Sequence, residues 1–411
     1  MLTPHEARET ILARIPEPSP DSVEEVPLTE AAGRLLAREA VSDVDLPPFE
    51  KSMMDGFALR ARDVEAAGAE LPCVGESRAG VPFAGAVPSR SCVEIFTGAE
   101  LPAECDAVEM VEYTRRDGER VTFERAVRAG QNVGHVGEIL ARGRAVLGPG
   151  HRLSAADLSV LASIGCDPTP VRRRLVVSVL TTGDELVPPT ELPGPGQIRE
   201  GNTLYLAAAC RALGHEVRRS GIVRDEEALL EAAFAEALDR GDALITTGGV
   251  SVGKYDLVGA AFEKLGVEPV LHRVAIKPGK PIWFGMLGRK PVFGLPGNPV
   301  SSLLGFEVFV RPALAKLAGA GEEEQAERLE HALWTGPEQR SSERQHNLPA
   351  RLRRAADGGL ELVPLAFRGS ADIVAAARAD ALVVVPADGA IRTGERVAYR
   401  PLARTGARAD C

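Results

Sequence analysis

Aromatic side chains are scarce in this sequence, and acidic residues outnumber basic ones. Phe, Trp and Tyr make up 4% of the 411 residues, so stacking on bases or sugars is not expected to dominate binding. The formal net charge of −10 argues against general binding to nucleic acids or anionic membranes. A chain of this charge that binds an anionic substrate needs a local group of lysines or arginines, or a bridging cation.

Metal-binding cysteine patterns and membrane signals are also missing. The six cysteines include no Cys-x-x-Cys pair, and no Cys/His grouping has zinc-finger spacing. Scattered cysteines of this kind are typical of reduced, mostly buried thiols. The first residues do not form a signal peptide, and no stretch reaches the roughly 18 apolar residues of a membrane span. We therefore expect a cytoplasmic protein that binds neither nucleic acid nor membrane.

Two segments with helix signals flank a segment rich in glycine and proline. Residues 1–40 begin with a capping box and are expected to form two helices, the second from about Thr29 through Leu36. Another capping box begins a helix within residues 140–171. The segment between them, residues 41–139, contains short β-type runs and a hairpin-turn candidate. The sequence thus predicts a discontinuous helical domain with a small β domain inserted into it.

Strand and helix patterns alternate over residues 172–320. Leu175–Leu180 is a continuous apolar run, as expected for a parallel strand that is buried on both faces. A long helix is expected from Asn298 through Val310. This alternation predicts a doubly wound α/β domain. Residues 325–411 are again β-like and predict a separate C-terminal β domain.

Acidic residues follow three strands of the expected sheet, at the edge where doubly wound sheets bind ligands. Glu185 follows the first strand and Asp225 the second, while Asp256 ends the loop after the third. Carboxylate oxygens suit a hard cation such as Mg²⁺. The sequence therefore predicts a divalent-cation site here. The alternative is that Asp225 and Asp256 only cap the helices that follow them.

The loop after the third strand is rich in glycine. Gly248 and Gly249 would let the backbone approach a phosphate closely, and Ser251 could add a hydroxyl. The loop nearly fits the P-loop pattern as far as Lys254, but Tyr255 stands where a Ser or Thr must bind Mg²⁺. An ATPase P-loop is therefore not expected.

Two further loops favour an anion. Lys277 and Lys280 stand in a Lys-Pro-Gly-Lys-Pro loop, whose prolines hold two ammonium groups close together. The segment Pro296–Ser301 opens a helix whose free N–H groups would attract an anion. The alternatives are a solvated turn for the lysines and an ordinary N-cap for the helix. Asp55 and Thr97, in the β domain, stand beside glycines and by themselves indicate only turns.

Six stretches together resemble the molybdopterin molybdenumtransferase family, which includes bacterial MoeA and the gephyrin E domain. They are Met54–Ala58, Phe96–Ala99, Thr182–Leu186, Gly248–Gly253, Lys277–Pro281 and Pro296–Ser301. None is specific alone, but all six occur in the family's order. The resemblance implies an L-shaped homodimer of four-domain subunits, with a MogA-like, molybdopterin-binding α/β domain and a C-terminal β-barrel. Its active cleft lies between the α/β domain of one subunit and the β domain of the other.

The resemblance also implies a reaction. Adenylated molybdopterin and molybdate become molybdenum cofactor and AMP, with a divalent cation that is usually Mg²⁺. Matching the motifs position by position implies catalytic roles for Asp55, Glu185, Asp225 and Asp256, with Glu185 and Asp256 as metal ligands. Substrate-binding roles are implied for Thr97, Gly248, Gly249, Ser251, Lys277, Lys280, Pro296, Ser301, Arg344 and Ser370.

The match is looser in the last domain, around Arg344 and Ser370. Arg368 stands where the family pattern has Gln, and Lys254 departs from a more acidic pair. Two other functions compete with molybdenum insertion. The adenylation step is one, because the related adenylyltransferase resembles this α/β domain, but the additional domains favour insertion. A non-catalytic scaffold is the other, and the lack of a long linker argues against it. Expected protein partners are that adenylyltransferase and molybdoenzyme apoproteins or their chaperones, in transient contacts.

Overall fold

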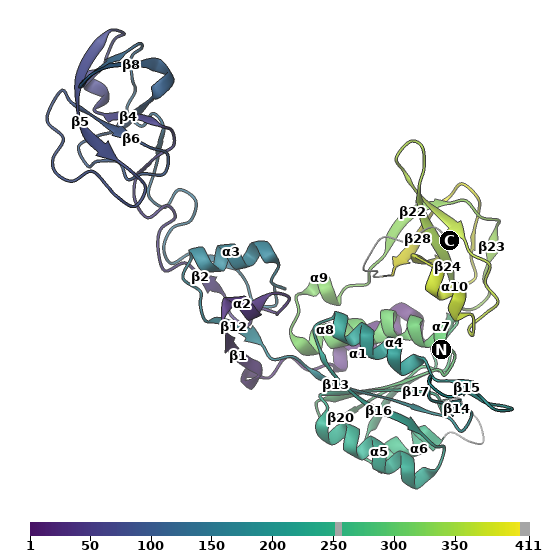
Figure 1. The fold of residues 1–411 in the computed structure, drawn as a ribbon. Coiled ribbons are helices and arrows are strands. Elements are labelled where there is room, and N and C mark those ends of the chain that lie inside the picture. Colours follow the sequence, from purple (N-terminus) through teal and green to yellow (C-terminus); the bar gives the residue numbers. More distant parts are fainter. Residues whose placement is uncertain (251–256, 403–411) are drawn as a thin grey trace.

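The computed structural model describes residues 1–250 and 257–402, which form an extended molecule (Figure 1). A β domain lies at one end and is joined through a small middle segment to the α/β domain. The C-terminal β domain stands on the α/β domain. Within the described part of the chain, no helix has both the length and the apolar character needed to cross a membrane.

A mixed six-stranded sheet forms the centre of the α/β domain. Its order is β16-β13-β17-β21-β20-β18. The first four strands are parallel, and β20 and β18 continue the sheet antiparallel. The bounds are Val176–Thr182 for β13, Glu216–Val223 for β16, Ala243–Thr247 for β17, Glu268–His272 for β18, Trp283–Leu287 for β20 and Lys290–Leu295 for β21. Because β13 lies between β16 and β17, the chain changes direction there, which confirms the doubly wound prediction.

Helices cover both faces of this sheet (Figure 1). On one face lie α5 (Glu227–Arg240) and α6 (Leu257–Lys264), whose phenylalanines stack with 4.6 Å between ring centroids. On the other lie α4 (Asn202–Ala212), α7 (Pro299–Gly305) and α8 (Arg311–Ala318). The long helix expected through Val310 is interrupted: a π-helical turn, Phe306–Val310, joins α7 to α8.

The first helix, α1 (Pro4–Arg14), packs against the α/β domain. It begins with the expected capping box of Thr3 and Glu6. Its buried residues Ala7 and Ile11 belong to the same core as the sheet and α8. The C-terminal end of α1 is held by the Lys316 ammonium, which donates a hydrogen bond to the Leu12 carbonyl at 3.0 Å. The sequence predicted α1 as part of the helical domain, because periodicity identifies an apolar face but not the surface that covers it.

The middle segment contains less helix than expected. Its helix α2 (Leu28–Ala31) is short, so the predicted helix through Leu36 is wrong beyond Ala31. Gly33 has a left-handed φ of 72°, which ends the helix, and Leu36 forms a β-bridge with Val171. Short strand pairs and one full helix complete the segment: β1 (Val23–Val26) with β12 (Thr169–Arg172), β2 (Ala40–Val41) with β11 (Ala145–Leu147), and α3 (Ala155–Ser163).

The inserted β domain is built on a six-stranded sheet of order β7-β4-β6-β5-β9-β8. The bounds are Gly56–Leu59 for β4, Ala69–Ser77 for β5, Cys92–Ile95 for β6, Ala107–Met110 for β7, Thr114–Asp117 for β8 and Arg120–Phe123 for β9. The predicted hairpin turn is confirmed between β8 and β9, where Gly118 has a φ of 60°. Each face of the sheet has its own buried apolar cluster.

The C-terminal domain is a closed β-barrel. Strand β24 pairs with both β25 and β26, so the ring β24-β25-β22-β28-β26 closes on itself. The bounds are Glu330–Trp334 for β22, Gln345–Arg354 for β24, Leu360–Pro364 for β25, Ala381–Val385 for β26 and Arg396–Pro401 for β28. Trp334 and Tyr399 fill its interior. A two-residue strand of the α/β domain, β19 (Ile276–Lys277), pairs with the edge of β24 and joins the two domains.

A buried ion pair stabilises the β domain. The Glu109 side chain is fully buried, and Arg125 donates two hydrogen bonds to it, at 2.7 and 3.0 Å. Burial opposes ionisation of Glu109, but hydrogen bonds from Arg125, the Met110 N–H and Gln131 outweigh it and lower the pKa. A carboxyl with a lowered pKa stabilises the fold above its unfolded pKa and loses that effect as the pH falls through the folded pKa.

We therefore expect Arg125→Ala to destabilise the β domain by about 1–3 kcal/mol, since it leaves a buried carboxylate without its main partner. Thermal unfolding at neutral pH measures this, and the loss should shrink in acid as Glu109 becomes protonated. Arg120→Ala is the matched control, because Arg120 is exposed and lies 3.7 Å from Glu70; its effect should stay within about 0.5 kcal/mol. Equal effects of the two changes would contradict the role of the buried pair.

Candidate functional site

Four loops meet at the edge of the sheet where the parallel strands end. The Gly183 N–H donates to the Val223 carbonyl at 3.3 Å, which joins the loops after β13 and β16. The Gly248 N–H donates to the Leu295 carbonyl at 3.1 Å, which joins the loops after β17 and β21. The predicted positions Glu185, Asp225, Gly248 and Pro296 therefore lie along one edge, as the doubly wound topology requires.

Glycine is required where the loop after β17 passes β13. A Cβ on Gly248 would lie 2.3 Å from the Thr182 carbonyl oxygen, and one on Gly249 would lie 2.4 Å from Cγ2 of Val258. Both glycines also have left-handed φ angles, 91° and 65°. Close packing against Thr182 and Val258 thus explains why both positions are glycine, without any ligand. Ser251 and Asp256, which the sequence analysis placed farther along this loop, lie outside the described residues.

Carboxylate side chains lie close together in the loops that follow β13 and β16. The Asp225 N–H donates to Oδ1 of Asp184 at 3.3 Å. The pKa of Asp225 is raised, first because its carboxyl is partly withdrawn from water and then because Asp184 and Glu185 are negatively charged nearby. Helix α5 has Glu226 at its N-cap, without a side-chain capping bond. Capping of α5 therefore does not account for Asp225.

These oxygen donors have the chemistry that a hard divalent cation prefers, and their mutual repulsion would be relieved by one. Among residues 1–250 and 257–402, no group of three His, Cys, Asp or Glu side chains is already spaced to hold a metal. Glu185, Asp184 and Asp225 are the carboxylates that the described part of this edge brings together.

Asn202, which the sequence analysis did not single out, joins three elements of the site. Its amide donates to Oγ1 of Thr247 at 3.0 Å and to the Gly297 carbonyl at 2.7 Å. The Thr247 hydroxyl in turn donates to the Pro296 carbonyl at 3.1 Å. Asn202 stands 45 and 95 residues from its two partners, so only the folded chain reveals the link. The local signal was no more than an asparagine at a helix start.

A cavity of about 620 Å³ opens beside this network, between the α/β domain and the barrel domain. Its lining from the α/β domain includes Thr182, Glu185, Asn202 and Asn298, and the loop of the barrel domain contributes Ala371. The cavity thus connects the carboxylate edge of the sheet with the segment around Ser370. Its size fits a drug-sized or nucleotide-sized ligand.

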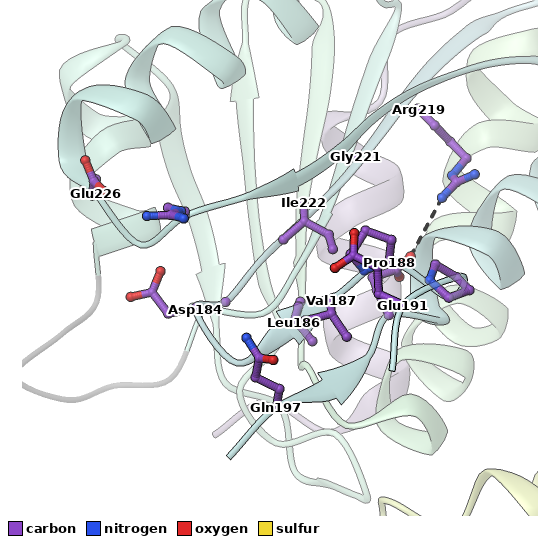
Figure 2. Close-up of a pocket in the computed structure, with 14 residues that line it drawn as sticks. Asp184, Leu186, Val187, Pro188, Glu191, Gln197, Arg219, Gly221, Ile222 and Glu226 are labelled. Atoms are coloured by element: carbon purple, nitrogen blue, oxygen red, sulfur yellow. Dashed lines mark ion pairs between the residues drawn. The ribbon is translucent and has the colours of Figure 1, made fainter. Parts of the chain in front are cut away.

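A second cavity, of about 710 Å³, lies on the outer side of the same loops. Figure 2 shows Asp184 and Glu226 at one side of it, and Glu191 and Arg219 at the other. The dashed line marks the ion pair of Arg219 with Glu200, 3.7 Å apart. Glu200 also accepts the N–H and hydroxyl of Thr203, at 2.6 and 2.8 Å, and so fixes the start of α4.

Predicted cationic residues meet where β19 pairs with β24. Lys277 is opposite His346 in this pairing. The pKa of His346 is lowered by burial and then by the positive charges of Lys277 and Arg344. The structure therefore brings Lys277 and Arg344 to the same place, although 66 residues of chain lie between them. The Lys277 side chain is exposed and that of Lys280 is half-buried.

The Lys-Pro-Gly-Lys-Pro loop runs beside α7. A Cβ on Gly279 would lie 3.6 Å from the Ser301 carbonyl oxygen, at van der Waals distance. The Val300 N–H, which the sequence analysis left free for an anion, donates to the Ser370 carbonyl at 3.0 Å. Ser301 itself is buried, with 3% of its surface exposed. The helix start therefore serves first to attach the barrel-domain loop, and Arg368 in that loop is exposed.

Asp55 and Thr97 contact each other but lie far from all of these residues. Oδ1 of Asp55 accepts both the N–H and the hydroxyl of Thr97, each at 2.7 Å, and these two bonds lower the pKa of Asp55. Asp55 precedes β4 and Thr97 follows β6, and Figure 1 shows these strands at the far end of the molecule from the α/β domain. Within one chain they do not join the site.

Three family models match consecutive parts of the chain. A model described as the MoeA N-terminal region (domain I and II) matches residues 2–165. One described as a probable molybdopterin binding domain matches residues 178–316, and one described as the MoeA C-terminal region (domain IV) matches residues 336–402.

Relatives and a solved structure match most of the chain or nearly all of it. A molybdopterin molybdenumtransferase of Haemophilus influenzae is 36% identical, over 98% of each chain. One of Staphylococcus epidermidis is 31% identical over 87% of this chain and 86% of the relative. The crystal structure of a molybdopterin biosynthesis MoeA protein from Pyrococcus horikosii is similar with a TM-score of 0.84 and 31% identity, over 98% of this chain and 99% of that one.

The crowded carboxylates predict a pH-dependent gain of stability from Asp225→Asn. Because the folded pKa of Asp225 is raised above its ordinary 3.8, the ionised form carries a folding penalty at neutral pH. Below the ordinary value the group is protonated in both states and the penalty vanishes. The variant should therefore unfold at a higher temperature than the wild type at pH 7 in EDTA, and the difference should close as the pH falls toward 4. A variant less stable than the wild type at pH 7 would refute the repulsion.

Proposed function

The chain belongs to the molybdopterin molybdenumtransferase family, and on that premise we propose how its residues carry out the reaction. The enzyme transfers molybdenum from molybdate into adenylated molybdopterin and releases molybdenum cofactor and AMP. The observation that carries this proposal is the 620 Å³ cavity, which has Glu185 on its α/β side and the Ser370–Ala371 segment on its barrel side. A cavity of this volume can hold a nucleotide-linked substrate, and Glu185 places a carboxylate in its lining.

The substrate and molybdate would bind at different parts of the edge. Lys277, Lys280 and Arg344 supply positive charge where an otherwise acidic protein needs it. We assign the anionic oxygens of molybdate to this group, beside Ser301 and Ser370. The pyrophosphate of the substrate lies along the loops after β13 and β17, at Gly248 and Gly249. The protein supplies position and charge, and the dithiolene sulfurs of the pterin capture the metal.

Glu185 and Asp256 are the proposed ligands of a divalent cation, with Asp225 next to them. The raised pKa of Asp225 supports this placement, because a nearby cation would offset both causes of the rise, which are the burial of the carboxyl and the negative charges of Asp184 and Glu185. When bound, Mg²⁺ would screen the pyrophosphate and make its cleavage easier. Asp256 is also proposed to orient the attacking group.

Asp55 and Thr97 enter the site only if a second copy of the chain supplies them. Figure 1 places β4 and β6 far from the sheet edge of the same chain. We therefore propose a homodimer in which the β domain of each subunit completes the cleft of the other. The enzyme is proposed to work in the cytoplasm, because the five described cysteines are all free, as is typical of proteins from a reducing compartment. There it would receive its substrate from the adenylyltransferase and pass its product to molybdoenzyme apoproteins or their chaperones.

Removing either lysine should weaken oxyanion binding without unfolding the protein. Lys277→Ala and Lys280→Ala each delete a charge-assisted contact worth roughly 1.5–3 kcal/mol, or about ten- to a hundredfold in affinity. Titration of molybdate at fixed ionic strength, with AMP release as the readout, measures the loss. Lys264→Ala is the matched control: it removes a cation of the same domain that pairs with Glu231 on α5. Wild-type molybdate dependence in both loop variants would show that the loop is a solvated turn.

Complementation of two inactive variants tests the shared cleft. Asp55→Ala and Asp256→Ala should each abolish AMP release. After subunit exchange in equal amounts, roughly a quarter of the wild-type activity should return, because random pairing makes half of the dimers mixed and each mixed dimer has one intact cleft of two. No recovery despite mixed dimers, shown by differently tagged subunits, would place both residues in a cleft of one chain. Wild-type activity of Asp256→Ala alone would remove its catalytic role.

A further inference from the structure

Two cysteines lie opposite each other in the sheet of the β domain. Cys73 on β5 is the register partner of Cys92 on β6, and the two strands run parallel. Neighbouring strands are about 4.8 Å apart, which is within the range of Cα separations that a disulfide bridges. Both thiols are free, and each acts on the pKa of the other, so the two side chains lie close together. The sequence alone showed only scattered cysteines, because 18 residues separate the pair.

The two thiols have different environments. Cys73 is half-buried, whereas Cys92 has no exposed surface. The Cys73 sulfur is 3.4 Å from the Gly75 carbonyl, and the Cys92 sulfur is 3.6 Å from that of Pro72. An outside molecule can therefore reach Cys73, while Cys92 can be reached only from within the sheet.

The electrostatic environment favours a thiolate at Cys73. The neighbouring Cys92 thiol lowers the pKa of Cys73 to about 6 against the opposing effect of burial, and the Arg116 guanidinium contributes. Arg116, on β8, also forms a 2.6 Å ion pair with Glu94 of β6, so it is fixed near the pair. The pKa of Cys92 is raised well above its ordinary value by the neighbouring Cys73 and by burial. Cys73 is thus the nucleophile, and Cys92 stays protonated until Cys73 loses its negative charge.

We propose that Cys73 and Cys92 are a thiol-modification site that takes a low-molecular-weight disulfide and converts it into an intramolecular disulfide between β5 and β6. The Cys73 thiolate attacks one sulfur of the disulfide R–S–S–R, forms Cys73–S–S–R and releases one R–S⁻. This mixed disulfide no longer carries the negative charge that kept Cys92 protonated. Cys92 then loses its proton to the released thiolate or to water. Its sulfur attacks the Cys73 sulfur and expels the second R–S⁻.

The net reaction balances: two protein thiols are oxidised by two electrons, and one disulfide is reduced to two thiols. Thiolate abundance alone would not single out Cys73. At pH 7 it holds roughly 30 times more thiolate than an ordinary thiol, but the lower basicity reduces intrinsic nucleophilicity by about tenfold, which leaves only a few-fold gain. The second thiol next to it makes the site distinct. This proposal does not depend on the proposed function.

The test is intact-mass and peptide mass spectrometry after incubation with oxidised glutathione at pH 7, in a Cys411→Ser background that removes the terminal thiol. The parent should lose two hydrogens and give a Cys73–Cys92 cross-linked peptide. Cys92→Ala should stop at the first step and carry one glutathione on Cys73. Cys73→Ser should acquire neither product. Cys105→Ser is the matched control and should behave as the parent, since burial raises the pKa of Cys105 to about 12.

Thermal melts of each variant confirm that the β domain stays folded; if Cys92→Ala unfolds, Cys92→Val replaces it, because Cys92 packs among apolar residues. An unchanged mass in the parent would overturn the proposal. Stable glutathione on Cys73 in the parent, without the cross-link, would also overturn it. So would a cross-link that persists in Cys73→Ser through another cysteine.

Discussion

The position of β13 between β16 and β17 is the constraint on which the candidate site depends. Both neighbours follow β13 in the chain and run parallel to it, so the loops after all three strands lie at one edge of the sheet. There the backbones approach so closely that Gly248 has no room for a side chain against Thr182. The same closeness withdraws the Asp225 carboxyl from water and brings it near Asp184 and Glu185, and both effects raise its pKa. Packing of the loops and electrostatic strain therefore have one cause, which is the strand order.

The acidic net charge makes the placement of the cations informative. Of the 48 lysines and arginines, many neutralise a nearby carboxylate, as Arg125 does for Glu109 and Arg173 for Asp242. Lys277 and Arg344 instead lie close enough to act together on His346, and this depresses its pKa. Like charges held together cost free energy in the free protein, so a bound oxyanion would recover that cost. This local concentration of charge, rather than the overall composition, suits an anionic substrate.

The sequence predicted the architecture better than the contacts between its parts. Periodicity and turn signals predicted the doubly wound sheet and the β8–β9 hairpin, and a capping box predicted the start of α1. The prediction of a helix through Leu36 was wrong because Gly33 takes a left-handed conformation. The prediction gave more weight to the local apolar spacing than to this glycine. Residues whose role depends on distant partners were missed: Asn202 needs Thr247 and Gly297 in place, and α1 needs α8 to cover its apolar face. The motif residues were found because glycines, prolines and charges stand close together in the sequence.

The β domain and the barrel domain differ in how they are attached to the α/β domain. The β domain has its own apolar clusters and its own buried ion pair, so its stability does not need the α/β domain. The barrel domain, in contrast, is attached to the α/β domain through β19 and through the bond from the Val300 N–H to Ser370. One part of the proposed site is therefore fixed during folding of a single chain, while Asp55 and Thr97 sit on an independent unit. The proposed homodimer would complete the cleft only when two folded chains meet, and dimerisation would then control activity directly, without any change in the fold of either subunit.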